Sequence, residues 1–190
     1  MNQARVMIVS QPNLWLREHM RAQVHALGLD DELGWRLFAP PHWHQTLCGP
    51  FDTCEQALLA LMAAGDAAQS EQPAFELSFN RIRGDKGEHI HWSFQACGRP
   101  KPFGHMLETL QAELKPFGLK DGGHRPHITI SYRAPYGLPT LPIGPLDWLI
   151  DEIQLVERSG SGKDFHYEVL HRWALKPPAR PRPEQLKLFH

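Results

Sequence analysis

The stretch Arg125-Pro126-His127-Ile128-Thr129-Ile130-Ser131-Tyr132 alternates polar and apolar side chains directly after a turn-forming Asp-Gly-Gly segment. This alternation, with its β-branched and aromatic residues, predicts a β-strand. Side chains two apart on a strand point to the same face. We therefore expect His127 and Thr129 together on one face and the two isoleucines on the core face. An imidazole beside a hydroxyl on a rigid strand can hold a phosphate group.

A second stretch of this kind, Trp43-His44-Gln45-Thr46-Leu47-Cys48, lies about eighty residues earlier. A single His-x-Thr pair is weak evidence, because the chain has 12 histidines and a similar His-x-Ser triplet at residues 91–93. Read alone, each triplet is better explained as polar side chains on a strand. The two His-x-Thr triplets are stronger together, since each follows a proline closely and ends in leucine or isoleucine.

Composition limits the classes of function. The chain has 190 residues, 42% of them hydrophobic and 22% charged, with a net charge of −1 and a pI of about 6.9. A protein that grips long nucleic acid is usually strongly basic, so we expect any nucleic acid to be held at an end or as a short single strand. Three cysteines without Cys-x-x-Cys spacing indicate neither a disulfide framework nor a thiolate metal site.

No apolar run approaches the length that spans a bilayer, and the N-terminus lacks the pattern of a signal peptide. We therefore expect no membrane association and a cytoplasmic location. The protein is also expected to be a monomer.

Periodicity and turn residues predict an α+β fold with antiparallel sheets. Asn13 and Thr53 are expected to cap helices at their N-termini, and Gly28 to end the first helix. The predicted strands are 6–9, 35–38, 43–48, 74–82, 89–96, 125–132, 148–156 and 166–175. The predicted helices are 14–27, 54–64 and one within 102–117, with a loop over 134–145. Residues 1–176 are predicted to form one domain built of two halves.

Two imidazoles on opposite sides of one phosphorus can divide the work of hydrolysis. One takes a proton from the attacking water and the other gives a proton to the departing oxygen. The threonine hydroxyls can hydrogen-bond the non-bridging oxygens. This scheme requires no metal and no cofactor.

The His44-Gln45-Thr46-Leu47 and His127-Ile128-Thr129-Ile130 segments resemble the paired His-x-Thr motifs of the 2H phosphoesterase superfamily. That superfamily includes the bacterial RNA 2′,3′-cyclic phosphodiesterases, often labelled 2′-5′ RNA ligases. The resemblance implies a bilobal, pseudo-twofold fold in which two antiparallel sheets flank a central cleft, with helices outside. It also implies metal-independent hydrolysis of cyclic phosphodiesters in RNA processing, with His44 as the acid, His127 as the base, and Thr46 and Thr129 on the phosphate.

Three further residues are predicted to bind the substrate. Arg133 follows the second motif, where relatives often carry an arginine, and Trp43 and Tyr132 could stack on a base. The first strand has Val6 and Met7 after Arg5, where RNA-directed relatives have aromatic residues. The sequence therefore leaves open whether the substrate is an RNA end with a 2′,3′-cyclic phosphate or a small cyclic nucleotide.

Two alternatives remain at this point. The His-x-His pairs at residues 42–44 and 89–91 could bind a transition metal, although no carboxylate at fixed spacing supports this. The chain could also be a non-catalytic protein that binds a nucleotide or RNA end and is recruited to a partner through its tail.

The tail begins at residue 177 with a proline-rich segment that favours an extended conformation. Its tip resembles the Gln-Leu-x-Leu-Phe peptide with which bacterial proteins dock on the DNA sliding clamp. The four residues that carry this resemblance are Gln185, Leu186, Leu188 and Phe189. The alternative is that this apolar tip packs on its own domain.

Overall fold

The computed structural model describes residues 4–84, 90–160 and 165–178. The strands within this part of the chain are β1 (Arg5–Ser10), β2 (Gln45–Asp52), β3 (Phe75–Gly84), β4 (Trp92–Ala96), β5 (His127–Ser131), β6 (Leu141–Ile150), β7 (Glu152–Ser159) and β8 (His166–Ala174). The helices are α1 (Leu14–Ala26), α2 (Leu29–Leu33), α3 (Glu55–Glu71) and α4 (Lys101–Leu114), with short 3₁₀ turns η1 (Gly34–Arg36), η2 (Pro40–His42) and η3 (Lys115–Phe117).

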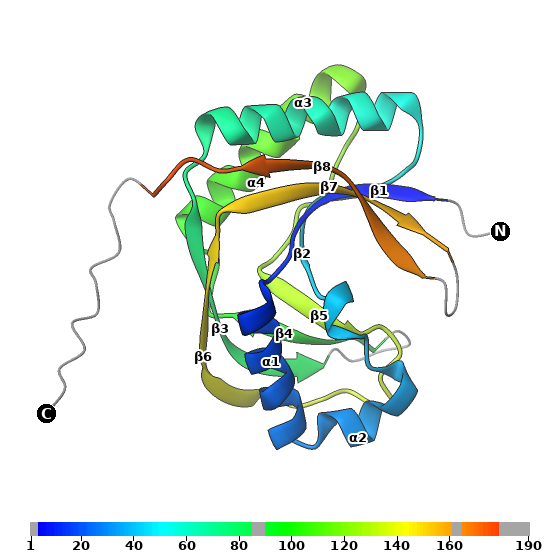
Figure 1. Cartoon of the computed structure of the whole chain (residues 1–190), viewed down its shortest axis with the longest axis vertical. Helices are drawn as coiled ribbons and strands as arrows, with labels where there is room; N and C mark the ends of the chain where they lie inside the picture. The colour runs from blue at the N-terminus through cyan, green and yellow to red at the C-terminus, as the bar shows by residue number, and fades with distance from the viewer. Residues whose placement is uncertain (1–3, 85–89, 161–164, 179–190) are drawn as a thin grey trace, which may run out of the picture.

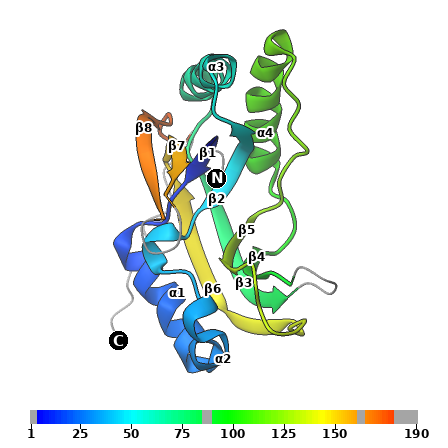
Figure 2. The same ribbon diagram turned by 90° about the vertical axis from the view of Figure 1, so that its right-hand side faces the viewer.

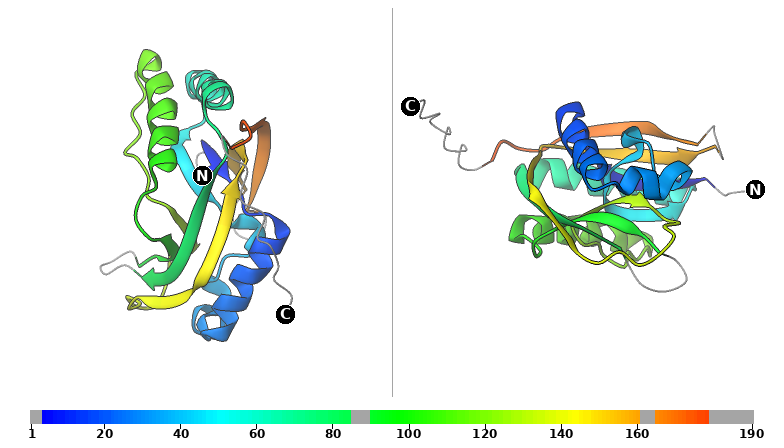
Figure 3. Two further views of the ribbon diagram at one scale, coloured as in Figure 1. Left: turned by 90° about the vertical axis from the view of Figure 1, so that its left-hand side faces the viewer. Right: turned by 90° about the horizontal axis from the view of Figure 1, so that it is seen from below.

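The strands form two four-stranded sheets, ordered β2-β1-β7-β8 and β5-β4-β3-β6, and every pairing within them is antiparallel. Only Asp151 separates β6 from β7, so the chain passes directly from one sheet into the other at this point (Figure 1; Figure 3, left). The strands that carry or follow the two His-x-Thr motifs, β2 and β5, are both edge strands. The predicted α+β class with two antiparallel sheets is confirmed.

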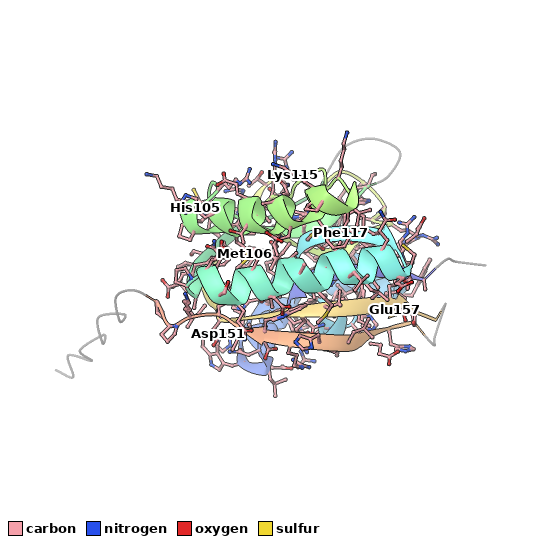
Figure 4. The ribbon with its side chains drawn as sticks, turned by 90° about the horizontal axis from the view of Figure 1, so that it is seen from above. His105, Met106, Lys115, Phe117, Asp151 and Glu157 are labelled. Carbon is pink, nitrogen blue, oxygen red and sulfur yellow. The ribbon has the colours of Figure 1, made fainter. Side chains whose placement is uncertain are left out.

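The helices lie outside the two sheets, in pairs at opposite ends of the molecule (Figures 1 and 2). The α3 and α4 helices lie side by side at one end of the molecule, and α1 and α2 lie at the other (Figures 1 and 2). Figure 4 views the first pair from above, with α3 over the β7 and β8 strands. None of the helices among the described residues is long and apolar enough to cross a membrane.

Each helix buries its apolar stripe against the sheets. In α1, Leu16, Met20 and Val24 are buried at helical spacing, and the Asn13 side chain accepts a hydrogen bond from the Leu16 amide at 2.9 Å. The predicted Asn13 cap is therefore confirmed, and Gly28 follows the helix in a left-handed conformation with φ of 67°. The cap of α3 is Cys54 rather than the predicted Thr53, since the Cys54 sulfur accepts from the amide three residues on.

One continuous apolar core contains residues of both sheets and of all four helices. The α3 helix approaches its sheet closely at Gly65, where an added Cβ would overlap the ring of Trp173. The Trp173 indole N–H also donates to Asp66 at 2.8 Å. A glycine is required here by the close approach of helix and sheet.

The strand predicted at residues 35–38 is wrong. Gly34, with φ of 51°, turns the chain into η1, and the Leu37 amide closes that turn on the Gly34 carbonyl at 3.1 Å. Trp35 is left 77% exposed. The apolar residues of this segment therefore do not form a buried strand.

The strand predicted at residues 148–156 is also corrected, because it is two strands in two sheets. Trp148 pairs with Leu77 in one sheet, whereas Val156 pairs with Val169 in the other. The loop predicted over 134–145 ends at Leu141, where β6 begins. The predicted pairing with residues 166–175 holds for the β7 part alone.

Lys176, which follows β8, is hydrogen-bonded to the segment between α3 and β3. Its amide donates to the Gln72 carbonyl at 3.2 Å, and its carbonyl accepts from the Ala74 amide at 2.7 Å. The predicted docking peptide, residues 185–189, lies outside the described residues, as does His89 of the second His-x-His pair.

Candidate active site

The two His-x-Thr motifs meet at one cleft of about 640 Å³, although they are about eighty residues apart in sequence. His44 and Thr46 line it from the start of β2, and His127 and Thr129 line it from β5. On β5 the predicted faces are observed: Ile128 and Ile130 are fully buried, whereas His127 and Thr129, which alternate with them, are partly exposed. The cleft therefore contains all four side chains predicted to be catalytic.

The two histidines are held by the same local hydrogen bond. His44 Nδ1 lies 2.7 Å from the His42 carbonyl, and His127 Nδ1 lies 2.8 Å from the Arg125 carbonyl. A carbonyl oxygen only accepts hydrogen bonds, so both Nδ1 atoms carry their proton. In each neutral ring Nε2 is then the nitrogen with the lone pair. Both rings are thus fixed in the tautomer whose Nε2 can exchange a proton with a substrate.

The pKa of His44 is lowered to about 4. Burial of the ring is the main cause, because an imidazolium loses hydration there. The hydrogen bond to the His42 carbonyl opposes this decrease in pKa. Charge repulsion from the His127 and His42 side chains lowers the pKa further. Both motif histidines line the same cleft. His44 is neutral near pH 7 in the free protein.

Positive charge predominates in the lining of the cleft. Among the described residues that line it, no aspartate or glutamate occurs, whereas four arginines do: Arg5, Arg36, Arg133 and Arg158. Arg5 forms a surface ion pair with Asp52 at 3.5 Å, and the Arg158 guanidinium lies 5.3 Å from the centre of the Phe165 ring. A cleft of this kind attracts an anionic ligand.

Tyr132 and Arg133 both line the cleft, although adjacent residues of a regular strand would point to opposite faces. The β5 strand ends at Ser131, whose hydroxyl accepts a hydrogen bond from the Arg133 amide at 3.2 Å. Tyr132 is about half exposed, and its ring lies 5.1 Å from that of Phe38. Desolvation raises the pKa of the Tyr132 hydroxyl, and a hydrogen bond with Thr129 opposes this shift.

The predicted stacking role of Trp43 is wrong in this structure. Its side chain is fully buried and its indole N–H donates to the Phe38 carbonyl at 3.0 Å. It packs near Phe94 in the core, with the ring centres 6.0 Å apart. Trp43 therefore supports the segment that precedes His44 and does not contact the cleft.

Sequence reasoning missed several residues of the cleft. Tyr167 of β8 lies with its ring centre 5.0 Å from that of His44, and burial raises its pKa to about 12. Arg158 near the end of β7 also lines the cleft, and its charge opposes the rise in pKa that burial causes at Tyr132 and Tyr167. No local motif marks these residues, because they reach the cleft only through the pairing of β7 with β1 and β8.

The metal alternative has little support from the donor set. Within the part of the chain that the structure describes, no group of three or more His, Cys, Asp and Glu side chains could hold a metal ion. His42 lines the cleft, and its ring lies 5.1 Å from Phe165 and 6.2 Å from Tyr167.

Comparisons with known proteins agree with this architecture. The chain is similar to the crystal structure of apo LigT from E. coli, with a TM-score of 0.72 and 21% identity over 93% of this chain and 99% of LigT. It is also similar to LigT complexed with 3′-AMP (TM-score 0.70, 21% identity, covering 92% and 99%). The protein TT0787 of Thermus thermophilus matches with a TM-score of 0.71 and 22% identity over 92% and 99%.

These likenesses confirm the bilobal 2H phosphoesterase fold that the two motifs implied. No curated protein matches the chain significantly. The sequence model of the 2′-5′ RNA ligase superfamily matches residues 16–162, which is most of the chain. The chain therefore belongs to the 2′-5′ RNA ligase superfamily.

Proposed function

We propose that this protein hydrolyses 2′,3′-cyclic phosphodiesters, on RNA ends or on small nucleotides, by acid–base catalysis between His44 and His127 without a metal. Membership of the superfamily supports an enzyme of the phosphoesterase or ligase type. The observation that carries the finer proposal is the matched geometry of the two motifs. Each histidine donates from Nδ1 to the carbonyl two residues before it, and both line one cleft.

The surroundings of the motifs support an anionic substrate. Thr46 and Thr129 supply hydroxyls to the cleft, and four arginines line it without a carboxylate among the described lining residues. A hydrogen bond to a charged group contributes roughly 1.5–3 kcal/mol. The complex of LigT with 3′-AMP belongs to a protein of the same fold and supports a nucleotide as the ligand class.

We assign the acid role to His44 and the base role to His127, as the resemblance of the two motifs to the superfamily implies. His44 is neutral in the free protein near pH 7, because burial lowers its pKa to about 4. A bound phosphodiester anion raises the pKa of an adjacent imidazole. We propose that His44 takes up a proton when substrate binds and then donates it to the departing oxygen, while His127 removes a proton from water.

The direct test is turnover of a nucleoside 2′,3′-cyclic phosphate in the presence of a chelator. Each of His44→Ala and His127→Ala should reduce kcat/KM by roughly 10²–10⁴-fold, the usual contribution of one acid or base. His105→Ala, on the exposed side of α4 (Figure 4), is the matched control and should leave the rate unchanged.

A phosphodiester with a p-nitrophenyl leaving group distinguishes the two roles, because a good leaving group needs no proton. His44→Ala should then lose little activity on this substrate, while His127→Ala loses as much as before. Near-full activity of either variant on the cyclic nucleotide would refute the proposal. Binding of the cyclic nucleotide by wild-type protein without turnover would instead favour a nucleotide-binding protein.

A further inference from the structure

We propose that Gln45, the middle residue of the first motif, is a positioning residue that fixes His127 relative to His44. The inference builds on the proposed function, because it concerns how the two histidines are held for that reaction. Gln45 is fully buried and points away from the cleft, between two residues that line it. Because Gln45 faces the core, its position in the motif does not by itself indicate a role in the active site.

The Gln45 amide binds the backbone of the other motif. Its Oε1 accepts a hydrogen bond from the His127 amide at 2.6 Å, and its Nε2 donates to the Arg125 carbonyl at 3.2 Å. The same Nε2 donates to the Thr46 carbonyl at 2.7 Å. One side chain therefore joins the backbone of both motifs.

These bonds replace a missing strand neighbour. The β5 strand is the edge of its sheet, and β2 is the edge of the other. Backbone groups on an unpaired edge need partners when they are removed from water. At the start of the β5 edge, Gln45 provides the hydrogen-bond acceptor for the His127 amide. Further along this edge, the Phe38 amide donates a hydrogen bond to the Ile130 carbonyl at 2.9 Å. The two sheets are thus joined at the point where the catalytic strands face each other.

The hydrogen bonds of Gln45 also distinguish the first motif from the second. The residue that corresponds to Gln45 in the second motif is Ile128, which is apolar and fully buried. The Arg125 carbonyl accepts from both His127 Nδ1 and Gln45 Nε2. The backbone amide and the ring of His127 are therefore held through Gln45 or through a carbonyl that Gln45 also binds. His44 has its own bond to the His42 carbonyl.

The test replaces Gln45 by leucine, which keeps the approximate volume and removes every hydrogen bond. A displacement of a catalytic group by about 1 Å can cost ~10²-fold in rate. We therefore expect Gln45→Leu to lower kcat by roughly 10–100-fold on the cyclic nucleotide, with KM almost unchanged. Gln45→Glu, assayed at mildly acidic pH, should recover part of the loss, because a protonated carboxyl has both a donor and an acceptor.

Gln154→Leu is the matched control. Gln154 is another buried glutamine on a strand; its amide binds Glu152 at 2.7 Å, and it is not among the residues that line the cleft. The control should keep the wild-type kcat. Equal kcat in the Gln45→Leu and Gln154→Leu proteins, or a loss fully explained by the unfolded fraction, would overturn the inference.

A second measurement does not depend on turnover. Amide hydrogen exchange in the full chain should accelerate at His127 in Gln45→Leu, while the amide of Ile128 keeps its protection. If wild-type protein shows no turnover, the proposed function fails but the positioning role is still decided, because unchanged hydrogen exchange at the His127 amide would refute it. If Gln45→Leu does not fold, hydrogen exchange at the His127 amide is compared between wild type and Gln45→Glu instead.

Discussion

The partly buried, uncharged state of His44 makes the stability of the fold depend on pH in a way that a single substitution can isolate. The pKa of His44 falls from the ordinary 6.5 to about 4 in the folded protein, mainly through burial. The unfolded chain therefore binds a proton at this residue more tightly than the folded one does. It follows that the folded state loses stability as the pH decreases from about 6.5 toward 4.

The size of this loss follows from the shift in pKa. A change of one pKa unit corresponds to about 1.4 kcal/mol. Between pH 7 and pH 4.5, His44 should therefore remove about 2–3 kcal/mol from the free energy of unfolding. His44→Asn keeps an amide donor for the His42 carbonyl but has no group that titrates in this range. This variant should lack that part of the pH dependence.

Urea unfolding, followed by the fluorescence of the 6 tryptophans, measures the effect. The wild-type protein, His44→Asn and the exposed control His105→Asn are compared at pH 7 and pH 4.5. The decrease in unfolding free energy should be smaller in His44→Asn by about 2–3 kcal/mol, and the same in the control as in wild type. An equal decrease in all three proteins would show that His44 is as hydrated in the folded state as in the unfolded one.

Three more predictions concern the cleft, the core and the tail. Binding of inorganic phosphate at pH 6 should take up protons, and His44→Asn should abolish most of this uptake. Calorimetry in buffers of different ionisation enthalpy measures the number of protons taken up. Identical uptake by the two proteins would contradict the protonation of His44 on ligand binding. Trp43→Ala should cost about 3–5 kcal/mol of stability because the side chain fills the core, whereas lower substrate affinity at unchanged stability would restore the stacking role. For the tail, we propose that a peptide of residues 183–190 binds the DNA sliding clamp. Fluorescence anisotropy should show binding that is lost when Leu188 and Phe189 are replaced by alanine, and an equal signal from both peptides would exclude docking through these anchors.

The second motif shows what local patterns predict well. Alternation in residues 127–130 correctly assigned the cleft face and the core face of β5, because a strand has a fixed period of two. Strict alternation does not continue beyond the strand. Tyr132 and Arg133 share the cleft because regular geometry ends at Ser131, and the end of a strand is set by its neighbours rather than by its own sequence.

The segment before the first motif shows where composition misleads. Residues 35–38 and Trp43 have similar aromatic and apolar character, yet Trp35 is 77% exposed and Trp43 is fully buried. Hydrophobicity alone does not separate them, since both outcomes depend on which element covers the residue. The turn at Gly34 directs one ring outward, and the packing of β4 near Trp43 buries the other.

The sequence by itself determined the class of fold, the α1, α3 and α4 helices with their buried stripes, and the four side chains that carry the expected chemistry; the short α2 helix was not predicted. These follow from periodicity and residue type, which act over a few neighbouring residues. Only the tertiary structure decided that β2 and β5 face each other, that Arg158 and Tyr167 join the cleft, and that Gln45 links the two motifs. The physical reason is that contacts between residues 45 and 127 depend on how two sheets pack over one core, and no local pattern records that arrangement.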